Sequence, residues 1–213
     1  MRTTWPERWP SSKRNLPKNV AIIGAGPLGR WLALTAARAG FRVLLEDVMP
    51  ANLHHAQEYI RGQLGPDGRN AGPSTTVAKA TSAQDDSIVG VTFVSTIEDA
   101  VREADLAIDC VPDELESKLE ILWLLDRMAP PRTVFATPTT RLSIADLASC
   151  TNREGKCVAI AAEARDLAGN PGARILLRTT TKTSPETVAL LDSFWRRLGF
   201  TPVFAEETVV SEQ

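Results

Sequence analysis

The sequence contains few cysteines and histidines, and it has no long apolar run. Its three cysteines are scattered among 213 residues without the spacing of metal ligands, so we expect reduced thiols. There is no apolar run of about 18 residues, and the N-terminus lacks the apolar stretch of a secretory signal, which favours a cytoplasmic protein with no membrane partner. The formal net charge is −2 with both signs interspersed, so nothing attracts the chain electrostatically to nucleic acid or an anionic bilayer.

The composition predicts one globular domain preceded by a short arm. Hydrophobic residues make up 43% and charged residues 23%, and this length permits one α/β domain with decorations. The first 19 residues hold five basic residues against Glu7, include Trp5 and Trp9, and show no regular period. We therefore expect an extended arm over residues 1–18 and a single domain over residues 19–213. The arm either docks on its own domain or a neighbouring subunit, which covers its tryptophans, or is a free terminus.

Short apolar runs alternate with helical patterns from Asn19 onward. Strand patterns cover residues 19–23, 42–46, 91–94, 106–110, 133–136, 157–162, 174–178 and 201–204. Helical patterns, counted from their first cap, cover residues 27–39, 51–64, 95–103, 113–128, 143–149 and 184–199. Ser95 and Glu98 indicate a capping box for the third of these helices. Strands joined by helices predict an α/β fold with a doubly wound, mainly parallel sheet.

A glycine-rich turn lies between the first predicted strand and the first predicted helix. Residues 24–29 read Gly-Ala-Gly-Pro-Leu-Gly and match the dinucleotide-binding pattern G-x-G-x-x-G. Gly24 permits the tight turn, Gly26 lets the backbone approach a diphosphate without a Cβ in the way, and Gly29 lets the helix pack on the strand. Pro27 suits the first helical position, and Pro27 and Leu28 open the helix whose free N–H groups would bind the diphosphate.

An acid follows this turn at the spacing expected for ribose recognition. Asp47 lies 18 residues after Gly29, close to the spacing of roughly 20 residues that the pattern requires. Glu46 precedes Asp47, and since strand alternation sends neighbouring side chains to opposite faces, we expect only Asp47 to reach the ribose. No Arg or Lys in residues 48–50 could neutralise a 2′-phosphate, which favours NAD over NADP. The alternative is a turn without a ligand and a solvent-exposed acid at a strand end.

Four blocks of the sequence resemble the NAD-binding domain of the 3-hydroxyacyl-CoA dehydrogenases. The blocks are NVAIIGAGPLGRWLALTAARAG at 19–40, VLLEDVMP at 43–50, ADLAIDCVPDELESK at 104–118 and ATPTTRLSIADL at 136–147. The resemblance implies a Rossmann-type fold, with NAD as the cofactor, the three glycines at its pyrophosphate and Asp47 at its adenine ribose. It also implies that an acid and a lysine approach the nicotinamide half, at positions that match Asp113 and Lys118. Without the resemblance, Asp113 is a helix-start acid and Lys118 part of a solvated face.

The sequence departs from this family at the catalytic positions. The family's histidine base corresponds to Ala161, which cannot move a proton, and the glutamate that orients the histidine falls at about Leu177. Thr140 matches the family's substrate-binding serine, and both residues offer a hydroxyl group. Glu163 and Asp166 are candidate replacement bases, although a carboxylate needs burial to reach a useful pKa.

Two further features bear on the substrate. The only histidines, His54 and His55, are expected on a partly exposed helix face beside the adenosine half, away from hydride chemistry. The chain ends at Gln213, where the family's helical domain would begin, and the break at residues 65–74 falls where the family contacts coenzyme A. We therefore expect an incomplete acyl-CoA pocket, and a homo-oligomer that covers the apolar surface left by the missing domain.

Together these features favour an NAD(H)-binding protein of the 3-hydroxyacyl-CoA dehydrogenase type. Its expected role is that of an oxidoreductase in hydroxyacyl or fatty-acid metabolism, with the dinucleotide and a small hydroxyacyl substrate as partners. One alternative is a non-catalytic NAD(H)-binding sensor or subunit that has lost the dehydrogenase base. Another is a vestigial site on a fold that presents an interaction surface through its tryptophan arm.

Overall fold

The computed structural model describes residues 16–64, 87–162 and 172–207. Most of the predicted arm, the break at 65–74 and the candidate bases Glu163 and Asp166 lie outside the described residues. The described cysteines, Cys110, Cys150 and Cys157, are free thiols. No helix of the described ranges is long and apolar enough to cross a bilayer.

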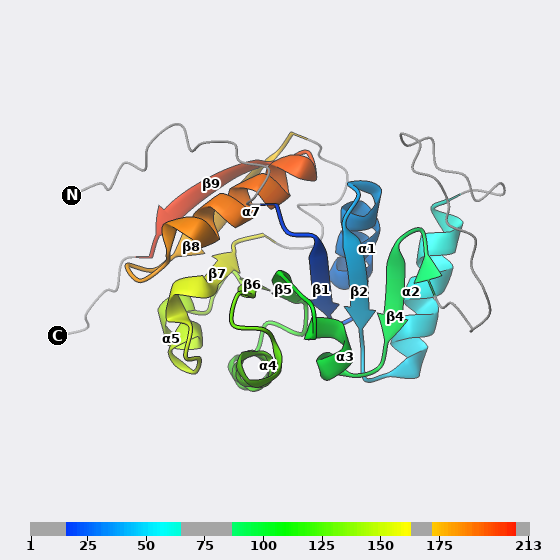
Figure 1. Ribbon diagram of the computed structural model, residues 1–213, viewed down its shortest axis with the longest axis horizontal. Coiled ribbons are helices and arrows are strands. Elements are labelled where there is room, and N and C mark those ends of the chain that lie inside the picture. Colours follow the sequence, from blue (N-terminus) through cyan, green and yellow to red (C-terminus); the bar gives the residue numbers. More distant parts are fainter. Residues whose placement is uncertain (1–15, 65–86, 163–171, 208–213) are drawn as a thin grey trace.

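The described residues form one sheet with helices on both of its faces (Figure 1). The strands are β1 (Asn19–Ile23), β2 (Arg42–Glu46), β3 (Ser87–Ile88), β4 (Val91–Val94), β5 (Leu106–Asp109), β6 (Val134–Pro138), β7 (Cys157–Ile160), β8 (Arg174–Thr179) and β9 (Thr201–Glu206). The helices are α1 (Pro27–Arg38), α2 (Pro50–Gly62), α3 (Ile97–Val101), α4 (Leu115–Met128), α5 (Ile144–Ser149) and α7 (Pro185–Arg197), with the short 3-10 turn η2 (Glu154–Lys156).

The strand order confirms the predicted doubly wound, mainly parallel sheet. It runs β3-β4-β2-β1-β5-β6-β7-β8-β9, and the strands of the central part, β4-β2-β1-β5-β6-β7, are parallel to one another. The order reverses at β1, which lies between β2 and β5, so a crevice forms beyond the carboxyl ends of these strands. Near the edges, β3 is antiparallel to β4 and β8 is antiparallel to β7, and the two-residue β3 was not predicted.

The core follows the alternation of side chains along the strands. Ile22 of β1 faces a cluster formed with α1, α2 and α7, whereas Ala21 and Ile23 face a cluster formed with α3, α4 and α5. Trp195 of α7 is fully buried in the first cluster. Burial on both faces explains why β1 reads as a continuous apolar run rather than as an alternating one.

Three helix starts differ from their predicted positions, and at α2 the helix begins at Pro50 rather than at 51. The cap of α3 is Thr96, whose hydroxyl accepts a hydrogen bond of 3.2 Å from the N–H of Asp99, so the prediction of Ser95 as the cap was wrong by one residue. Helix α4 begins at Leu115 rather than at 113, and its two end residues, Leu115 and Met128, are 43% and 42% exposed. The two ends of α4 are therefore outside the core, whereas Leu122 and Leu125 in its middle are fully buried.

Candidate functional site

The glycine-rich turn has the geometry that its three glycines predict. Gly24 has φ of +99°, a left-handed conformation that favours glycine, and its N–H donates to the carbonyl oxygen of Glu46 at 2.8 Å. A Cβ on Gly29 would overlap the carbonyl oxygen of Gly24, so α1 can approach the turn only because Gly29 has no side chain. A Cβ on Gly26 would meet no atom within 4 Å. The space in front of Gly26 is therefore open to a ligand.

The N-terminus of α1 offers unused donors to this space. Gly26 is the N-cap and provides no side-chain cap, and Pro27 occupies the first turn. Within the described residues, the backbone N–H groups of Gly26, Leu28 and Gly29 have no hydrogen-bond acceptor. Free N–H groups at a helix N-terminus bind anions such as a diphosphate. The donor set and the open space therefore fit the diphosphate of a dinucleotide.

Asp47 lies immediately after β2 and connects it to the glycine-rich turn. One carboxylate oxygen, Oδ2, accepts a hydrogen bond from the N–H of Ala25 at 2.8 Å, and the other, Oδ1, accepts one from the N–H of Met49 at 2.8 Å. The side-chain amide of Asn52 lies 3.1 Å from both oxygens. Asp47 is 8% exposed, so these contacts fix its carboxylate at the edge of the crevice.

A cavity of about 560 Å³ lies between the glycine-rich turn, the end of β2 and the starts of α2, α3 and α4. We call it the first cavity. Its walls are Ile23, Gly24, Gly26, Pro27, Glu46, Asp47, Val48, Met49, Asn52, Ile97, Cys110, Val111, Pro112 and Ile121. Most of this wall is apolar, and the two neighbouring acids both belong to it.

The expectation that Glu46 points away from Asp47 was therefore incomplete. Strand alternation holds inside β2, but β2 ends at Glu46, and Asp47 belongs to the following turn. The two side chains consequently line the same cavity. Burial, followed by the charge of Asp47, raises the pKa of Glu46 to about 7.

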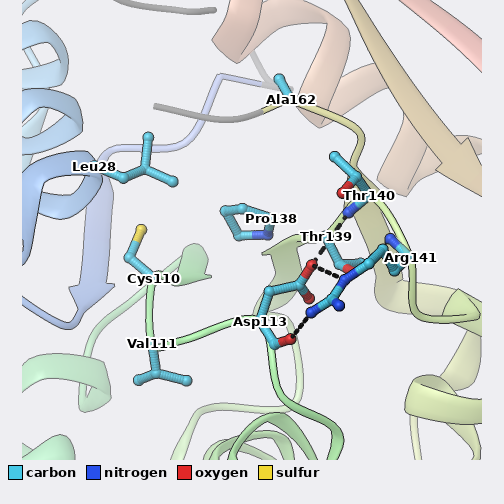
Figure 2. A pocket seen from close by; sticks show the side chains of 9 residues that line it. All are labelled: Leu28, Cys110, Val111, Asp113, Pro138, Thr139, Thr140, Arg141 and Ala162. Carbon is cyan, nitrogen blue, oxygen red and sulfur yellow. Dashed lines mark hydrogen bonds and ion pairs between the residues drawn. The ribbon is translucent and has the colours of Figure 1, made fainter. Parts of the chain in front are cut away.

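A second cavity of about 430 Å³ lies beyond the carboxyl ends of β5, β6 and β7. Figure 2 shows Leu28 and Cys110 on one side, Asp113 and Arg141 on the opposite side, and Ala162 at a further edge. The remaining wall residues are Val111, Pro138, Thr139 and Thr140. Cys110 and Val111 also line the first cavity, so the two cavities are adjacent.

Asp113 brings two loops of the second cavity together. Its Oδ2 atom accepts a hydrogen bond of 3.4 Å from the N–H of Thr140, and its carbonyl oxygen accepts one of 3.0 Å from the guanidinium of Arg141. Its Oδ1 atom is buried and has no partner among the described residues. Asp113 thus offers an unused acceptor at the wall where the resemblance places the nicotinamide half of the cofactor.

Lys118 is completely buried and lines neither cavity. Its Nζ atom donates to Asp109 Oδ2 at 3.1 Å and to Thr137 Oγ1 at 3.1 Å. Its Nζ is also 3.4 Å from the carbonyl oxygen of Val111. Lys118 therefore lies beneath the loop that contains Val111 and borders both cavities. The alternative expectation, that Lys118 belongs to a solvated helix face, was wrong.

The positions of the family's catalytic pair hold no acid or base. The N–H of Ala161 donates to the carbonyl oxygen of Leu176 at 2.9 Å, and the next residue, Ala162, lines the second cavity. Leu177 is fully buried in the core and pairs with Ile160. His54 and His55 are exposed on α2, where His54 lies 3.3 Å from Glu58.

Sequence reasoning missed Asn52, Arg141 and the role of Glu46. Asn52 follows Asp47 by five residues, on the first turn of α2, and no pattern marks such a residue. Arg141 lies within the quoted block at 136–147, but a single arginine in a loop carries no motif. Only the folded loops bring Arg141 to Asp113.

Comparison with known proteins identifies the family. Residues 19–161, about two thirds of the chain, match the family described as 3-hydroxyacyl-CoA dehydrogenase, NAD binding domain. The mitochondrial hydroxyacyl-coenzyme A dehydrogenase of Sus scrofa is 29% identical over 214 residues, covering 93% of this chain and 62% of that enzyme. A 3-hydroxybutyryl-CoA dehydrogenase of Bradyrhizobium diazoefficiens is 30% identical over 143 residues, covering 67% of this chain and 46% of that enzyme.

A solved structure is also similar to this chain. The 5-formyl-3-hydroxy-2-methylpyridine 4-carboxylic acid 5-dehydrogenase, an NAD+-dependent dismutase, matches with a TM-score of 0.72 at 27% identity, over 90% of this chain and 58% of that chain. The chain spans about half to three fifths of the length of these relatives. The predicted resemblance and the predicted cofactor, NAD, are confirmed by the family match. This chain belongs to the family of NAD-binding domains of 3-hydroxyacyl-CoA dehydrogenases.

Proposed function

We propose that this chain is the NAD(H)-binding domain of an oxidoreductase that acts on hydroxyacyl compounds. The observation that carries the proposal is the open space in front of Gly26, which is bordered by the free N–H groups of α1 and by the carboxylate of Asp47. In this arrangement the N–H groups of Gly26, Leu28 and Gly29 bind the diphosphate. The adenosine half lies in the first cavity and the nicotinamide half reaches the second.

Asp47 has two roles in this proposal. It holds the turn through the N–H of Ala25, and it accepts a hydrogen bond from the adenosine ribose. Three donor groups already form four hydrogen bonds with its two carboxylate oxygens, so the ribose hydroxyl displaces the amide of Asn52, the donor shared between both oxygens.

The second cavity is where the substrate would meet the cofactor. When bound, NAD supplies a hydride acceptor that converts a secondary alcohol to a carbonyl compound. Asp113 offers Oδ1 as an acceptor for the nicotinamide half, and Thr140 offers a hydroxyl to the substrate. Lys118 does not contact the ligand in this proposal. Its Nζ atom donates to the carbonyl oxygen of Val111 and so fixes the loop between the two cavities.

A non-catalytic NAD(H)-binding module is the second candidate function, and Ala161 favours it. The methyl side chain of Ala161 cannot take the hydroxyl proton of a substrate. Leu177 is a buried core residue and cannot orient a base. Restoring the pair is also opposed by the fold, because Leu177→Glu would bury a carboxylate among apolar side chains. Under this reading, Ala161→His alone creates no dehydrogenase activity.

Titration of the purified chain with NADH tests the shared part of both candidates. We expect saturable binding that Asp47→Ala weakens at least tenfold and that Asp146→Ala, an exposed acid of α5, leaves unchanged. Oxidation of NADH with acetoacetyl-CoA then separates them, because turnover supports the oxidoreductase and binding without turnover supports the module. Absence of NADH binding contradicts both.

Self-association is a further part of the proposal. Leu115, Trp123 and Met128 of α4 are between 42% and 48% exposed, and Val48 and Met49 beside the first cavity are 76% and 55% exposed. Covering apolar surface of this kind stabilises an oligomer. Sedimentation of the purified chain is expected to show a homo-oligomer, and a monomer at micromolar concentration would contradict this part.

A further inference from the structure

The carboxyl group of Glu46 has no part in the roles proposed above, although Glu46 lines the first cavity. Glu46 is 4% exposed, yet it belongs to the cavity wall. Within the described residues its side chain has no hydrogen-bond or ion-pair partner, whereas the Asp47 carboxylate accepts four hydrogen bonds from three donor groups. Buried polar groups are normally paired, so this carboxyl group is available to a ligand that fills the cavity.

Apolar side chains surround Glu46 in the wall of the first cavity. The neighbouring strand β1 contributes Ile23, α3 contributes Ile97 and α4 contributes Ile121 to the same wall. Under the proposed function this is the adenosine end of the site, since Asp47 and the glycine-rich turn border it. The adenine ring has two apolar faces and a polar edge, so it is the part of the dinucleotide that suits isoleucine side chains beside a carboxyl group.

We infer that Glu46 binds the adenine base, with its neutral carboxyl group accepting a hydrogen bond from the N6 amino group and donating one to the ring nitrogen N7. Adenine presents a donor and an acceptor side by side along one edge. A neutral carboxyl group presents the complementary acceptor and donor, whereas a carboxylate can only accept. The inference rests on the proposed function, because it requires the dinucleotide to lie in the first cavity.

The charges around Glu46 agree with a neutral form. Asp47 is the charged group on the cavity wall, Cys110 is the other titratable group, and β1, α3 and α4 contribute isoleucines. Burial and Asp47 raise the pKa of Glu46 to about 7, and burial raises the pKa of the Cys110 thiol well above its usual range. Glu46 is therefore the wall residue that changes charge near neutral pH.

The inference predicts how NADH affinity changes with pH. Below pH 7 Glu46 already carries the proton that it donates, whereas above pH 7 the proton must be taken up when the dinucleotide binds. The dissociation constant for NADH should therefore rise about tenfold for each pH unit above 7. Glu46→Gln keeps a neutral acceptor and donor, so its affinity should stay within about threefold from pH 6 to pH 9.

The test is titration of the full chain with NADH from pH 6 to pH 9 by calorimetry or tryptophan fluorescence. Glu58→Gln, the same substitution on the exposed face of α2, is the control and should follow the wild-type profile. Calorimetry at pH 7 in two buffers of different ionisation enthalpy should show uptake of about half a proton per NADH in the wild type and none in Glu46→Gln. If Glu46 had only a structural role, proton uptake on NADH binding would be the same in the wild type and in Glu46→Gln.

A base analogue provides a test that is independent of pH. Nicotinamide hypoxanthine dinucleotide replaces the N6 amino donor by a carbonyl acceptor, so at pH 6 the wild type should bind it at least tenfold more weakly than NAD. Glu46→Val should not discriminate between the two dinucleotides. A flat wild-type pH profile, or equal binding of the two dinucleotides by the wild type, overturns the inference while leaving NADH binding intact. Loss of NADH binding at every pH overturns the proposed function itself.

Discussion

The carboxylate of Asp47 accepts a hydrogen bond of 2.8 Å from the backbone N–H of Ala25. This contact joins the end of β2 to the middle of the glycine-rich turn, so the acid that follows the turn in sequence also holds it in place. The shape of the turn and the proposed recognition of the ribose therefore both depend on the side chain of Asp47.

Asp47→Ala is expected to weaken NADH binding by about 10 to 100-fold, because the loss of hydrogen bonds to a charged group costs about 1.5–3 kcal/mol. Asp47→Asn retains one oxygen acceptor for Ala25 and should lose less affinity. Titration with NADH measures both. Equal affinity of Asp47→Ala and the wild type would contradict the role of this acid.

Two glycine substitutions separate ligand binding from stability. Gly26→Ala places a methyl group in open space, so the free energy of unfolding should change by less than about 1 kcal/mol while NADH affinity falls at least tenfold. Gly29→Ala forces a methyl group against the carbonyl oxygen of Gly24 and should cost about 3 kcal/mol of stability. Denaturant unfolding and NADH titration of both variants check the pair. Normal affinity in a folded Gly26→Ala variant would exclude a diphosphate at this place.

Lys118→Met is expected to lower the free energy of unfolding by about 3–5 kcal/mol, because it leaves Asp109 buried without its cation. Adding Asp109→Asn removes that charge and should recover part of the loss. A double-mutant cycle by chemical denaturation measures the coupling. A loss below about 1 kcal/mol in Lys118→Met would show that the pair does not hold the loop.

Glu46 also makes the stability of the protein depend on pH. Its pKa in the fold, about 7, lies above the ordinary value of 4.5, so the stability that it contributes is fully present below pH 4.5 and is lost as the pH rises through 7. The glutamine of Glu46→Gln does not titrate, so the variant does not lose this stability when the pH rises. The difference in free energy of unfolding between Glu46→Gln and the wild type should therefore shift by about 2 kcal/mol in favour of the variant from pH 5 to pH 8. Denaturant unfolding at the two pH values measures this, and an unchanged difference would contradict the raised pKa.

The sequence predicted the elements of the sheet because their local signals are strong. The apolar run at β1, the proline at the start of α1 and the glycines of residues 24–29 all act within a few residues. The cap of α3 was displaced by one residue because Thr96 and Asp99 form the same kind of pair as Ser95 and Glu98. The antiparallel pairing of β8 with β7 depends on long-range packing that no local pattern records.

The site was predictable where one turn and one acid define it, and less so where separate loops meet. Lys118 was identified from the family pattern, but its complete burial against Asp109 follows from the packing of α4 on β5 and β6. Glu46 was set aside by strand alternation, which ceases to apply where β2 ends. Arg141 reaches Asp113 only because the loops after β5 and β6 lie side by side, as Figure 2 shows.

A crystal structure of the purified chain soaked with NADH at pH 6 would locate the ligand directly. We expect the diphosphate on the N–H groups of Gly26, Leu28 and Gly29, the ribose at Asp47 and the adenine beside Ile97 in the first cavity. A dinucleotide bound elsewhere, or an empty crevice at saturating NADH, would contradict the assignment.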